Sequence, residues 1–214
     1  MADNITINTG SGGPVVAADD ISSVFYQRVK LSVGADGSAT DVSSAAPLPV
    51  GGLVTRADTE FTRPANTTAY TAGDVVSNST SATTLITLAN AVRVNAGTGY
   101  IVRVAVTTDL KSITPKIRVH FYNASDPTVS VDNAAMRHLY VDNAKRLGYV
   151  DLPAMTTGTD TTNSTMSMSV NDTCRLAVVA GASTTSLYAV LEALDAFTPA
   201  SGQKFTLTVF TDCN

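Results

Sequence analysis

Long charged side chains are scarce in this sequence, and tryptophan is absent. Of its 214 residues only 15% are Asp, Glu, Lys or Arg, and the formal net charge is −4. A chain without a basic excess has no field to hold phosphates, so we expect no direct binding of nucleic acid. No run of about 18 apolar residues occurs, so we expect no membrane span. The N-terminal residues MADNITINTGSGG lack the basic start and apolar run of a secretory signal, so we expect synthesis in a reducing cytoplasm.

Residue types that carry chemistry are also few. The only cysteines are Cys174 and Cys213, and a reducing cytoplasm keeps two such distant thiols unpaired. The only histidines are His120 and His138, and no HExxH or paired CxxC spacing accompanies them, so we expect no metal site. The two glutamates lie far apart in the sequence, unlike the acid pair of a glycoside hydrolase. No GxSxG or other nucleophile motif appears. We therefore expect no enzyme and no cofactor.

Two Asp-Asn dipeptides each lie within the sequence Val-Asp-Asn-Ala, at Asp132-Asn133 and Asp142-Asn143. Carboxylate and amide oxygens are the ligands that Ca²⁺ prefers, so one interpretation is a calcium site. The same side chains also bond backbone N–H groups in Asx turns and at helix N-caps. No EF-hand spacing accompanies the dipeptides, which favours the turns and caps.

The strongest pattern in the sequence is an alternation of apolar and polar residues between Gly99 and Asn123. The apolar positions on one parity are Tyr100, Val102, Val104 and Val106, followed on another by Ile113, Ile117, Val119 and Phe121. A side chain that recurs every second residue faces a core only in extended backbone, so we expect two half-buried strands. The linker TTDLKS between them is typical of a hairpin connection. His120 shares the opposite parity with Lys116 and Arg118, which predicts an exposed or interfacial imidazole.

Further short segments of the same kind predict an all-β fold. The candidate strands are Asp74–Ser77, Thr84–Val94, Gly99–Thr108, Ile113–Tyr122, Arg146–Leu152, Thr173–Ala180, Ser186–Asp195 and Lys204–Asp212. Short strands separated by turn signals are typical of a jelly-roll-like antiparallel β-sandwich. Between them we expect single helical turns at Asn143–Leu147 and Asn133–Leu139. The polar segment Thr156–Asn171 predicts a long exposed loop.

The sequence before residue 65 differs from this body. Residues 1–20 are polar and Gly-rich and bury too little to order themselves, which predicts a flexible or partner-ordered segment. Residues 25–33 alternate like one amphipathic strand that ends in a Gly turn. A segment rich in Pro and Gly follows, from Ser43 to Pro64, and favours an extended path. We therefore predict two parts: residues 1–64 as an extended N-terminal arm with one or two strands, and residues 65–214 as the β-sandwich.

The predicted arm holds the candidate partner-binding residues. These are Phe25, Tyr26, Val29, Leu31, Pro47, Leu48, Pro49 and Val50. An isolated strand is not stable by itself, so one interpretation is an arm that adds its strand to a neighbouring subunit or shell. The alternative is an edge strand that folds back onto its own sheet. Tyr140 and Tyr149 are candidates for stacking on a sugar or a partner, although core or inter-subunit packing is the commoner use of tyrosine.

Several motifs of the body resemble a family of tailed-bacteriophage virion structural proteins. They are Thr68–Val76 (TAYTAGDVV), Val92–Asn95 with Gly97 and Gly99, Val131–Ala135 (VDNAA), Leu147–Val150 (LGYV), Leu187–Val190 (LYAV) and Phe197–Ser201 (FTPAS). Their order along the chain, from about residue 68 to 210, is more specific than any single motif. The segment Pro47–Val50 with the strand before it is similar to leader segments of phage structural proteins.

The resemblance implies a capsid decoration or cement protein, or a head fibre, with a jelly-roll body and threefold assembly. Its partners would be the major capsid protein and further copies of itself, on the capsid surface of the virion. A receptor-binding or glycan-binding protein of the tail or head fibre is the alternative, and it would need an exposed aromatic cluster with convergent polar groups. A depolymerase would need a pair of acidic residues in a groove, which this sequence does not indicate.

Overall fold

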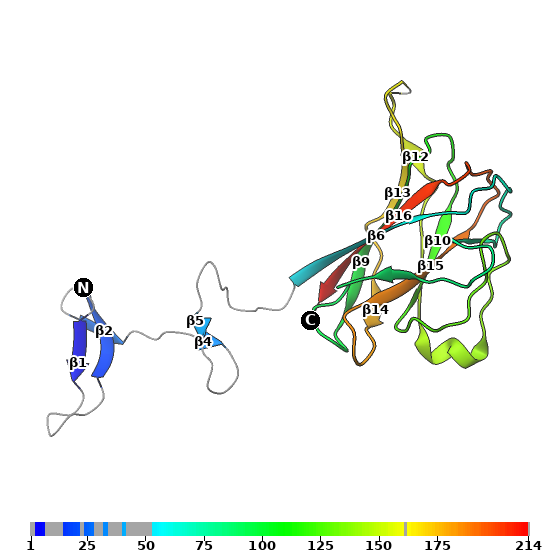
Figure 1. Ribbon diagram of the computed structural model, residues 1–214. Helices are drawn as coiled ribbons and strands as arrows, with labels where there is room; N and C mark the ends of the chain where they lie inside the picture. Colours follow the sequence, from blue (N-terminus) through cyan, green and yellow to red (C-terminus); the bar gives the residue numbers. More distant parts are fainter. Residues whose placement is uncertain are drawn as a thin grey trace. The chain divides into compact units, whose positions relative to one another are not determined.

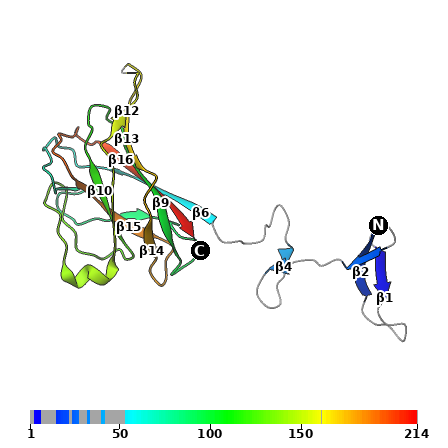
Figure 2. The same cartoon turned by 180° about the vertical axis from the view of Figure 1, so that it is seen from behind.

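A computed structural model describes residues 53–160 and 162–213 with their side chains, and the backbone of five short strands before them. The chain divides into two units, residues 1–50 and 51–214. Both units are drawn in Figure 1 and, from behind, in Figure 2. In the part of the chain that the structure describes, no helix is long and apolar enough to cross a membrane.

The N-terminal unit contains a three-stranded sheet and a pair of short strands. The strands β1 (Asp3–Thr6), β2 (Val15–Ile21) and β3 (Val24–Gln27) form an antiparallel sheet in that order. The strand β4 (Ser32–Val33) pairs with β5 (Thr40–Asp41). The sequence predicted no ordered element in residues 1–20, whereas β1 and most of β2 lie there. The β-branched residues in DNIT and VVAADDI favour strands over loops.

Two of the predicted partner-binding residues, Phe25 and Tyr26, belong to β3, an edge strand of this sheet. The other predicted residues lie outside the described part of the chain: Val29, Leu31, Pro47, Leu48, Pro49 and Val50. The single strand predicted over residues 25–33 corresponds to β3 and β4, and the residues between these two strands are outside the description as well.

The C-terminal unit is an antiparallel β-sandwich, as the sequence predicted. Its first sheet has the order β12-β13-β9-β16-β6, and β14 also pairs with β9. The strands of this sheet are β6 (Leu53–Thr62), β9 (Thr98–Thr108), β12 (Thr156–Thr157), β13 (Ser167–Asn171), β14 (Leu176–Val179) and β16 (Lys204–Cys213).

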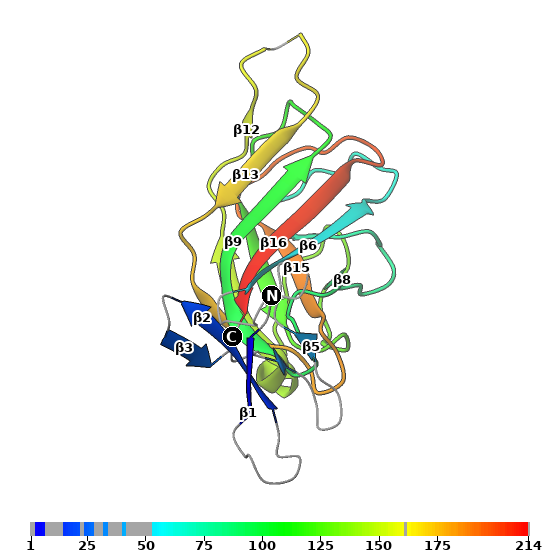
Figure 3. The same ribbon diagram turned by 90° about the vertical axis from the view of Figure 1, so that its left-hand side faces the viewer.

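The second sheet packs behind the first, which faces the viewer in Figure 3. Its order is β11-β10-β15-β7, and β8 also pairs with β15. The strands of this sheet are β7 (Val75–Val76), β8 (Ile86–Leu88), β10 (Ile117–Tyr122), β11 (Arg146–Asp151) and β15 (Leu187–Ala193). The core between the sheets is apolar and includes Leu88, Ile101, Val104, Val106, Ile117, Val119, Phe121, Leu191, Phe205 and Leu207.

The order of pairing identifies the sandwich as a jelly roll. Two short strands, β7 and β8, share one position beside β15, and β13 and β14 share one beside β9. The positions along the chain are then β6, β7/β8, β9, β10, β11, β13/β14, β15 and β16. The first position pairs with the last, the second with the seventh, the third with the sixth and the fourth with the fifth. A single long hairpin rolled into two sheets has this pairing, which is the jelly-roll arrangement.

The sandwich begins earlier in the chain than the sequence predicted. The predicted arm ran to residue 64, but β6 pairs with β16 along its whole length. Within β6, Ala57 and Phe61 are buried and alternate with the exposed charges of Arg56, Asp58 and Glu60. Prolines flank this strand in the sequence and concealed its alternation, because proline is unfavourable in central strands. The boundary between the two units therefore lies at residues 50–51, not at 64–65.

The predicted hairpin between β9 and β10 is wrong. The strand β9 belongs to the first sheet and β10 to the second, so residues 109–116 cross between the sheets. A bulge in β9 also changes its alternation: the register with β16 shifts between Phe210 and Thr211 and leaves Val102 as an extra residue. Ile101 and Val104 are therefore both fully buried, and Val102 is only half-buried. One extra residue moves the following side chains to the opposite face of the strand.

Two polar segments also differ from the prediction. The predicted loop at residues 156–171 contains β12 and β13, which pair with each other and extend the first sheet. Ser167 and Ser169 of β13 are buried on its inner face. The helical turn predicted at residues 143–147 lies earlier, in the 3-10 helix η1 (Tyr140–Lys145), and residues 133–139, all of them described, contain no helix. Hydroxyl-rich segments lack a clear hydrophobic period, so their local structure is hard to predict.

A buried ion pair joins the end of β6 to two distant loops. Arg63 Nη2 lies 3.3 Å from Asp132 Oδ2, and neither side chain has exposed surface. The hydroxyl of Tyr70 donates to Asp132 Oδ1 at 2.6 Å and accepts from Arg63 Nε at 2.9 Å. Arg63 also donates to the carbonyls of Asn66 at 2.7 Å and Ala200 at 3.2 Å. Burial raises the pKa of Tyr70, so its hydroxyl keeps the proton that it donates. These bonds compensate the cost of burying two charges.

Three of the motifs that carry the family resemblance meet at this ion pair: residues 68–76, 131–135 and 197–201. Tyr70 forms a backbone bridge with Phe197, and their rings stack with centroids 4.7 Å apart. The motif side chains at this junction bind one another, so their role in this structure is to hold the loops together.

We predict that Tyr70→Phe lowers the free energy of unfolding by about 1–3 kcal/mol, because it leaves the buried Nε of Arg63 without its hydrogen-bond partner and removes one hydrogen bond of Asp132. Urea denaturation followed by circular dichroism measures this change. The matched control is Tyr149→Phe. Tyr149 is 49% exposed, and its variant should stay within about 0.5 kcal/mol of the parent. Equal losses in the two variants would contradict the role of the Tyr70 hydroxyl.

Candidate functional site

A segment of chain, residues 123–145, runs between β10 and β11 over the outer face of the second sheet. Val129 of this segment packs with Tyr122 and Val190 of the sheet in a small hydrophobic cluster, separate from the core between the sheets. Arg137 of this segment donates to the carbonyl of Val129 at 3.3 Å. The segment therefore covers part of a sheet face that would otherwise meet water.

His120 lies on this outer face, and only 1% of it is exposed. Its Nε2 lies 2.7 Å from Glu192 Oε2 on the neighbouring strand β15. Its ring meets the ring of His138 edge to face, with centroids 4.9 Å apart. The predicted strand face of His120 is correct, but the predicted exposure is wrong. Strand alternation predicts the face to which a side chain points, but it does not predict whether another segment of the chain buries this face.

The environment keeps His120 neutral. Burial lowers the pKa of His120 to about 3, and the charges of His138 and Arg146 act in the same direction. A neutral imidazole has one N–H, and the contact with the carboxylate places this proton on Nε2, from which it is donated to Glu192. Burial also raises the pKa of Glu192 and lowers that of His138.

An exposed ion pair borders the histidine on the same face. Arg118 donates to both carboxylate oxygens of Asp151, at 2.5 and 2.9 Å. The Arg118 guanidinium also lies over the ring of Tyr149, 4.2 Å from its centroid. The pair lowers the pKa of Asp151 through this hydrogen bonding. It fixes the side chains across β10 and β11 beside the buried imidazole.

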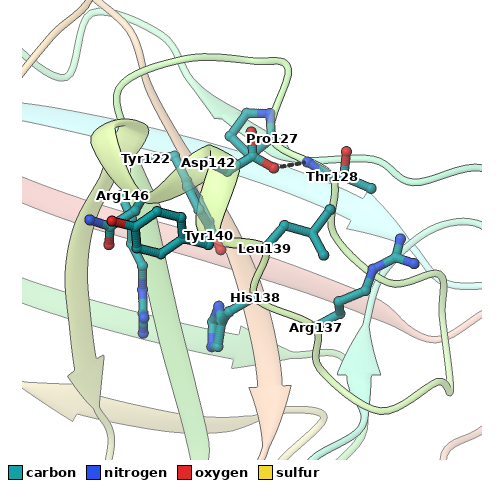
Figure 4. A pocket seen from close by; sticks show the side chains of 10 residues that line it. Tyr122, Pro127, Thr128, Arg137, His138, Leu139, Tyr140, Asp142 and Arg146 are labelled. Carbon is teal, nitrogen blue, oxygen red and sulfur yellow. Dashed lines mark hydrogen bonds between the residues drawn. The ribbon is translucent and has the colours of Figure 1, made fainter.

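A pocket of about 250 Å³ opens between η1 and this sheet face (Figure 4). Its aromatic and basic lining includes Tyr122, Arg137, His138, Tyr140 and Arg146. In Figure 4, Tyr140 and Arg146 lie on one side of the pocket and Arg137 on the other, with His138 and Leu139 between them. The side chain of Tyr140 is the most exposed large apolar group of the described residues, at 94%.

The carboxylate in the pocket wall is already bound. Asp142 accepts a hydrogen bond from the backbone amide of Thr128 at 2.9 Å and one from Lys145 Nζ at 3.2 Å. Both bonds lower the pKa of Asp142, with the amide of Thr128 as the larger cause. Asp132, from the other Asp-Asn dipeptide, belongs to the buried pair with Arg63. Both aspartates thus bind groups of the protein itself.

The described residues offer no obvious reacting group. Among residues 53–160 and 162–213, no three His, Cys, Asp or Glu side chains lie close enough to hold a metal ion. The one imidazole paired with a carboxylate, His120, is buried beneath residues 123–145. Both cysteines are free thiols, with Cys213 buried and Cys174 half-buried.

The sequence identified only part of this site. Tyr140 and Tyr149 were predicted as candidates for an exposed contact, and both are exposed. Arg137 and Arg146 were not identified, because they belong to no motif. Their one signal in the sequence is their place on either side of the segment HLYVDNAK, whose apolar residues follow neither a strand nor a helix period.

Comparisons with known proteins assign no family to the chain. No protein-family model matches it, and no curated protein is significantly similar to it.

We predict that the free energy of unfolding falls as the pH drops from 6.5 towards 4.5. His120 takes up a proton in this range when unfolded but not when folded, since its pKa falls from 6.5 to about 3 on folding. The loss reaches up to about 2 kcal/mol. The raised pKa of Glu192 acts with the opposite sign and offsets a part of it. Carboxylates with a lowered pKa, such as Asp151, lose their stabilisation at lower pH.

Denaturation by urea at several pH values tests this prediction. His120→Gln keeps a donor for Glu192 but cannot titrate, so the dependence on pH between 6.5 and 4.5 should become flatter. His138→Gln is the matched control, and because His138 is exposed its effect should be smaller. An unchanged pH dependence in His120→Gln would show that the buried imidazole is not its source.

Proposed function

We propose that the chain is a structural protein of a tailed-bacteriophage virion and decorates the outer surface of the head. As a cement protein it would bind the major capsid protein and copies of itself and stabilise the shell. Many copies, each weakly held, add up to a stable coat through multivalency. The role needs no catalysis, nucleic acid or membrane, and the host cytoplasm would be the place of synthesis.

The main support for this proposal is the division of the chain into two folded units, one of them a jelly roll. A sandwich with a continuous core supplies a rigid block for the particle surface. The motifs that resemble phage virion proteins lie in this block, and three of them meet at its buried junction. A separate unit at the N-terminus is available for a different contact.

Attachment through the N-terminal unit is the second part of the proposal. The strand β3, with Phe25 and Tyr26, is an edge of the three-stranded sheet. An edge strand has one row of backbone N–H and C=O groups that can pair with a strand of another protein. Strand addition of this kind uses main-chain hydrogen bonds for affinity and makes small demands on the partner's sequence.

Contact between copies is the third part, and the outer face of the first sheet supports it. Among residues 53–160 and 162–213, no other segment passes in front of the strands of this sheet in Figure 3. The face carries the ring of Phe210 between Arg103 and Arg56, whose guanidinium carbons lie 5.3 and 5.9 Å from the ring centroid. Met168 and Val179 are each 39% exposed on it. An open face with apolar side chains and both signs of charge suits a closed, threefold arrangement of identical subunits.

The alternative function is a receptor-binding or glycan-binding protein of the tail or head fibre. One observation favours it: the exposed Tyr140 stands at a pocket lined by basic and aromatic side chains. A decoration protein is still preferred, because the two-unit organisation and the motifs are explained by it.

Two measurements on virions test the proposed function. In purified particles of the phage that encodes the chain, quantitative mass spectrometry should find a copy number comparable with that of the major capsid protein. A copy number like that of a tail protein would contradict the decoration role and support the alternative.

Heads stripped of the protein should rebind the full-length chain, while residues 51–214 alone should bind much more weakly. Equal binding of both would refute attachment through the N-terminal unit.

We predict that the full-length chain is a trimer in size-exclusion chromatography with light scattering, and that the double variant Met168→Glu with Val179→Glu is a monomer. New like charges on the open face would repel each other across an interface. The matched control is Val94→Glu, a substitution of an exposed valine in a loop before β9, at 56% exposure. A monomeric parent, or a variant that stays trimeric, would exclude this face as the contact.

A further inference from the structure

The guanidinium of Arg146 is poorly satisfied by the protein. It offers five N–H donors, but its one side-chain hydrogen bond among the described residues is a long contact of Nη2 with His120 Nδ1 at 3.5 Å. Nε is buried and has no hydrogen-bond partner. No carboxylate of the described residues forms an ion pair with it, whereas Arg118 on the same face pairs with Asp151. A half-buried cation in this state calls for an anion from outside the chain.

Arg146 places a positive charge at the pocket. Burial is the larger cause of the lowered pKa of His120 and His138, and the charge of Arg146 acts in the same direction. At Tyr122 and Glu192 this charge opposes burial, which raises the pKa of both groups. Arg137 adds a second positive charge to the pocket lining. The only carboxylate there, Asp142, is bound to Lys145 and to a backbone amide. An anionic group in the pocket would thus meet two arginines. Glu192, a carboxylate near Arg146 but outside the pocket lining, is bound to His120.

The size and the aromatic lining narrow the class of ligand. The pocket holds about 250 Å³, less than the roughly 300 Å³ at the lower end of sites for drug-sized molecules. Tyr140 stands beside Arg146 in Figure 4 and exposes its ring almost completely. A tyrosine ring of this kind covers the apolar face of a sugar, while its hydroxyl remains available for a hydrogen bond. A free phosphate or acetate would make no use of this ring.

We propose that this pocket binds one carboxylated sugar unit, such as a hexuronic acid or a sialic acid, with its carboxylate on Arg146 and its ring against Tyr140. Arg137 on the opposite side would bind ring hydroxyls or a second acidic group. Arginine suits the planar carboxylate because its N–H groups match both oxygens. This inference goes beyond the proposed decoration of a capsid and does not depend on it. It would give the exposed coat an affinity for acidic glycans.

Binding of purified single sugars to the full-length chain tests the proposal. Glucuronate and N-acetylneuraminate are titrated in separate experiments, and chemical-shift changes in the protein's NMR spectrum report binding. At least one of them should bind, and at least ten-fold more tightly than glucose, acetate and inorganic phosphate. Binding of glucose at equal strength would overturn the role of the carboxylate. Equal binding of acetate or phosphate would overturn the role of the sugar, and no binding of either acid would overturn the proposal.

Three variants locate the site. Arg146→Gln should weaken binding of the acidic sugar at least ten-fold, and Arg93→Gln, which removes an exposed positive charge outside the pocket, should leave it unchanged. Tyr140→Ala should weaken binding several-fold, and because its side chain is exposed, this variant keeps the fold even if Arg146→Gln does not. Undiminished binding in Tyr140→Ala would place the sugar elsewhere and refute the proposed site.

Discussion

Arg63 enters the interior at the end of β6, and a guanidinium that is buried there has to be neutralised. Asp132 supplies the charge, and Tyr70 connects the two groups. The backbone amide of Ser77 donates to the same carboxylate at 2.9 Å. The position of several loops at this end of the sandwich therefore depends on one ion pair. Three of the motifs that resemble phage virion proteins meet at this pair, and their side chains there bind one another and stabilise the fold.

The two outer faces of the jelly roll have different surroundings. The proposed contact between copies uses the outer face of the first sheet, and the proposed sugar pocket lies on that of the second. On the second sheet, residues 123–145 bury His120 and leave a small basic pocket beside η1. On the first sheet, rings and aliphatic side chains such as Phe210 and Met168 remain at the surface. The covered face suits a small ligand, and the open face suits a flat protein surface. A rigid sandwich can serve both because its core lies between the sheets and needs neither outer face.

Burial of His120 and its polar neighbours costs free energy, and residues 123–145 increase this cost because they shield these side chains from water. A buried neutral imidazole between arginines keeps its place through the carboxylate of Glu192. Arg118 has the carboxylate of Asp151, and Arg146 has none among the described residues. This asymmetry distinguishes a structural arginine from one that can accept a ligand. It arises only after the strands are aligned, because β10 brings the imidazole between side chains of β11 and β15.

The sequence by itself determined the all-β class and many of the inward faces. In β10, alternation placed Ile117, Val119 and Phe121 in the core, where all three are fully buried, since a period of two leaves an extended strand no other apolar face. Only the tertiary structure decided that β9 and β10 belong to different sheets and that β6 completes the sandwich. It also decided that a bulge at Val102 changes which side chains of β9 face the core. The burial of His120 and the pocket at Arg146 depend on the tertiary structure as well. Periodicity depends on residues that are close in the sequence, whereas strand pairing and the burial of a sheet face depend on segments that are distant in it.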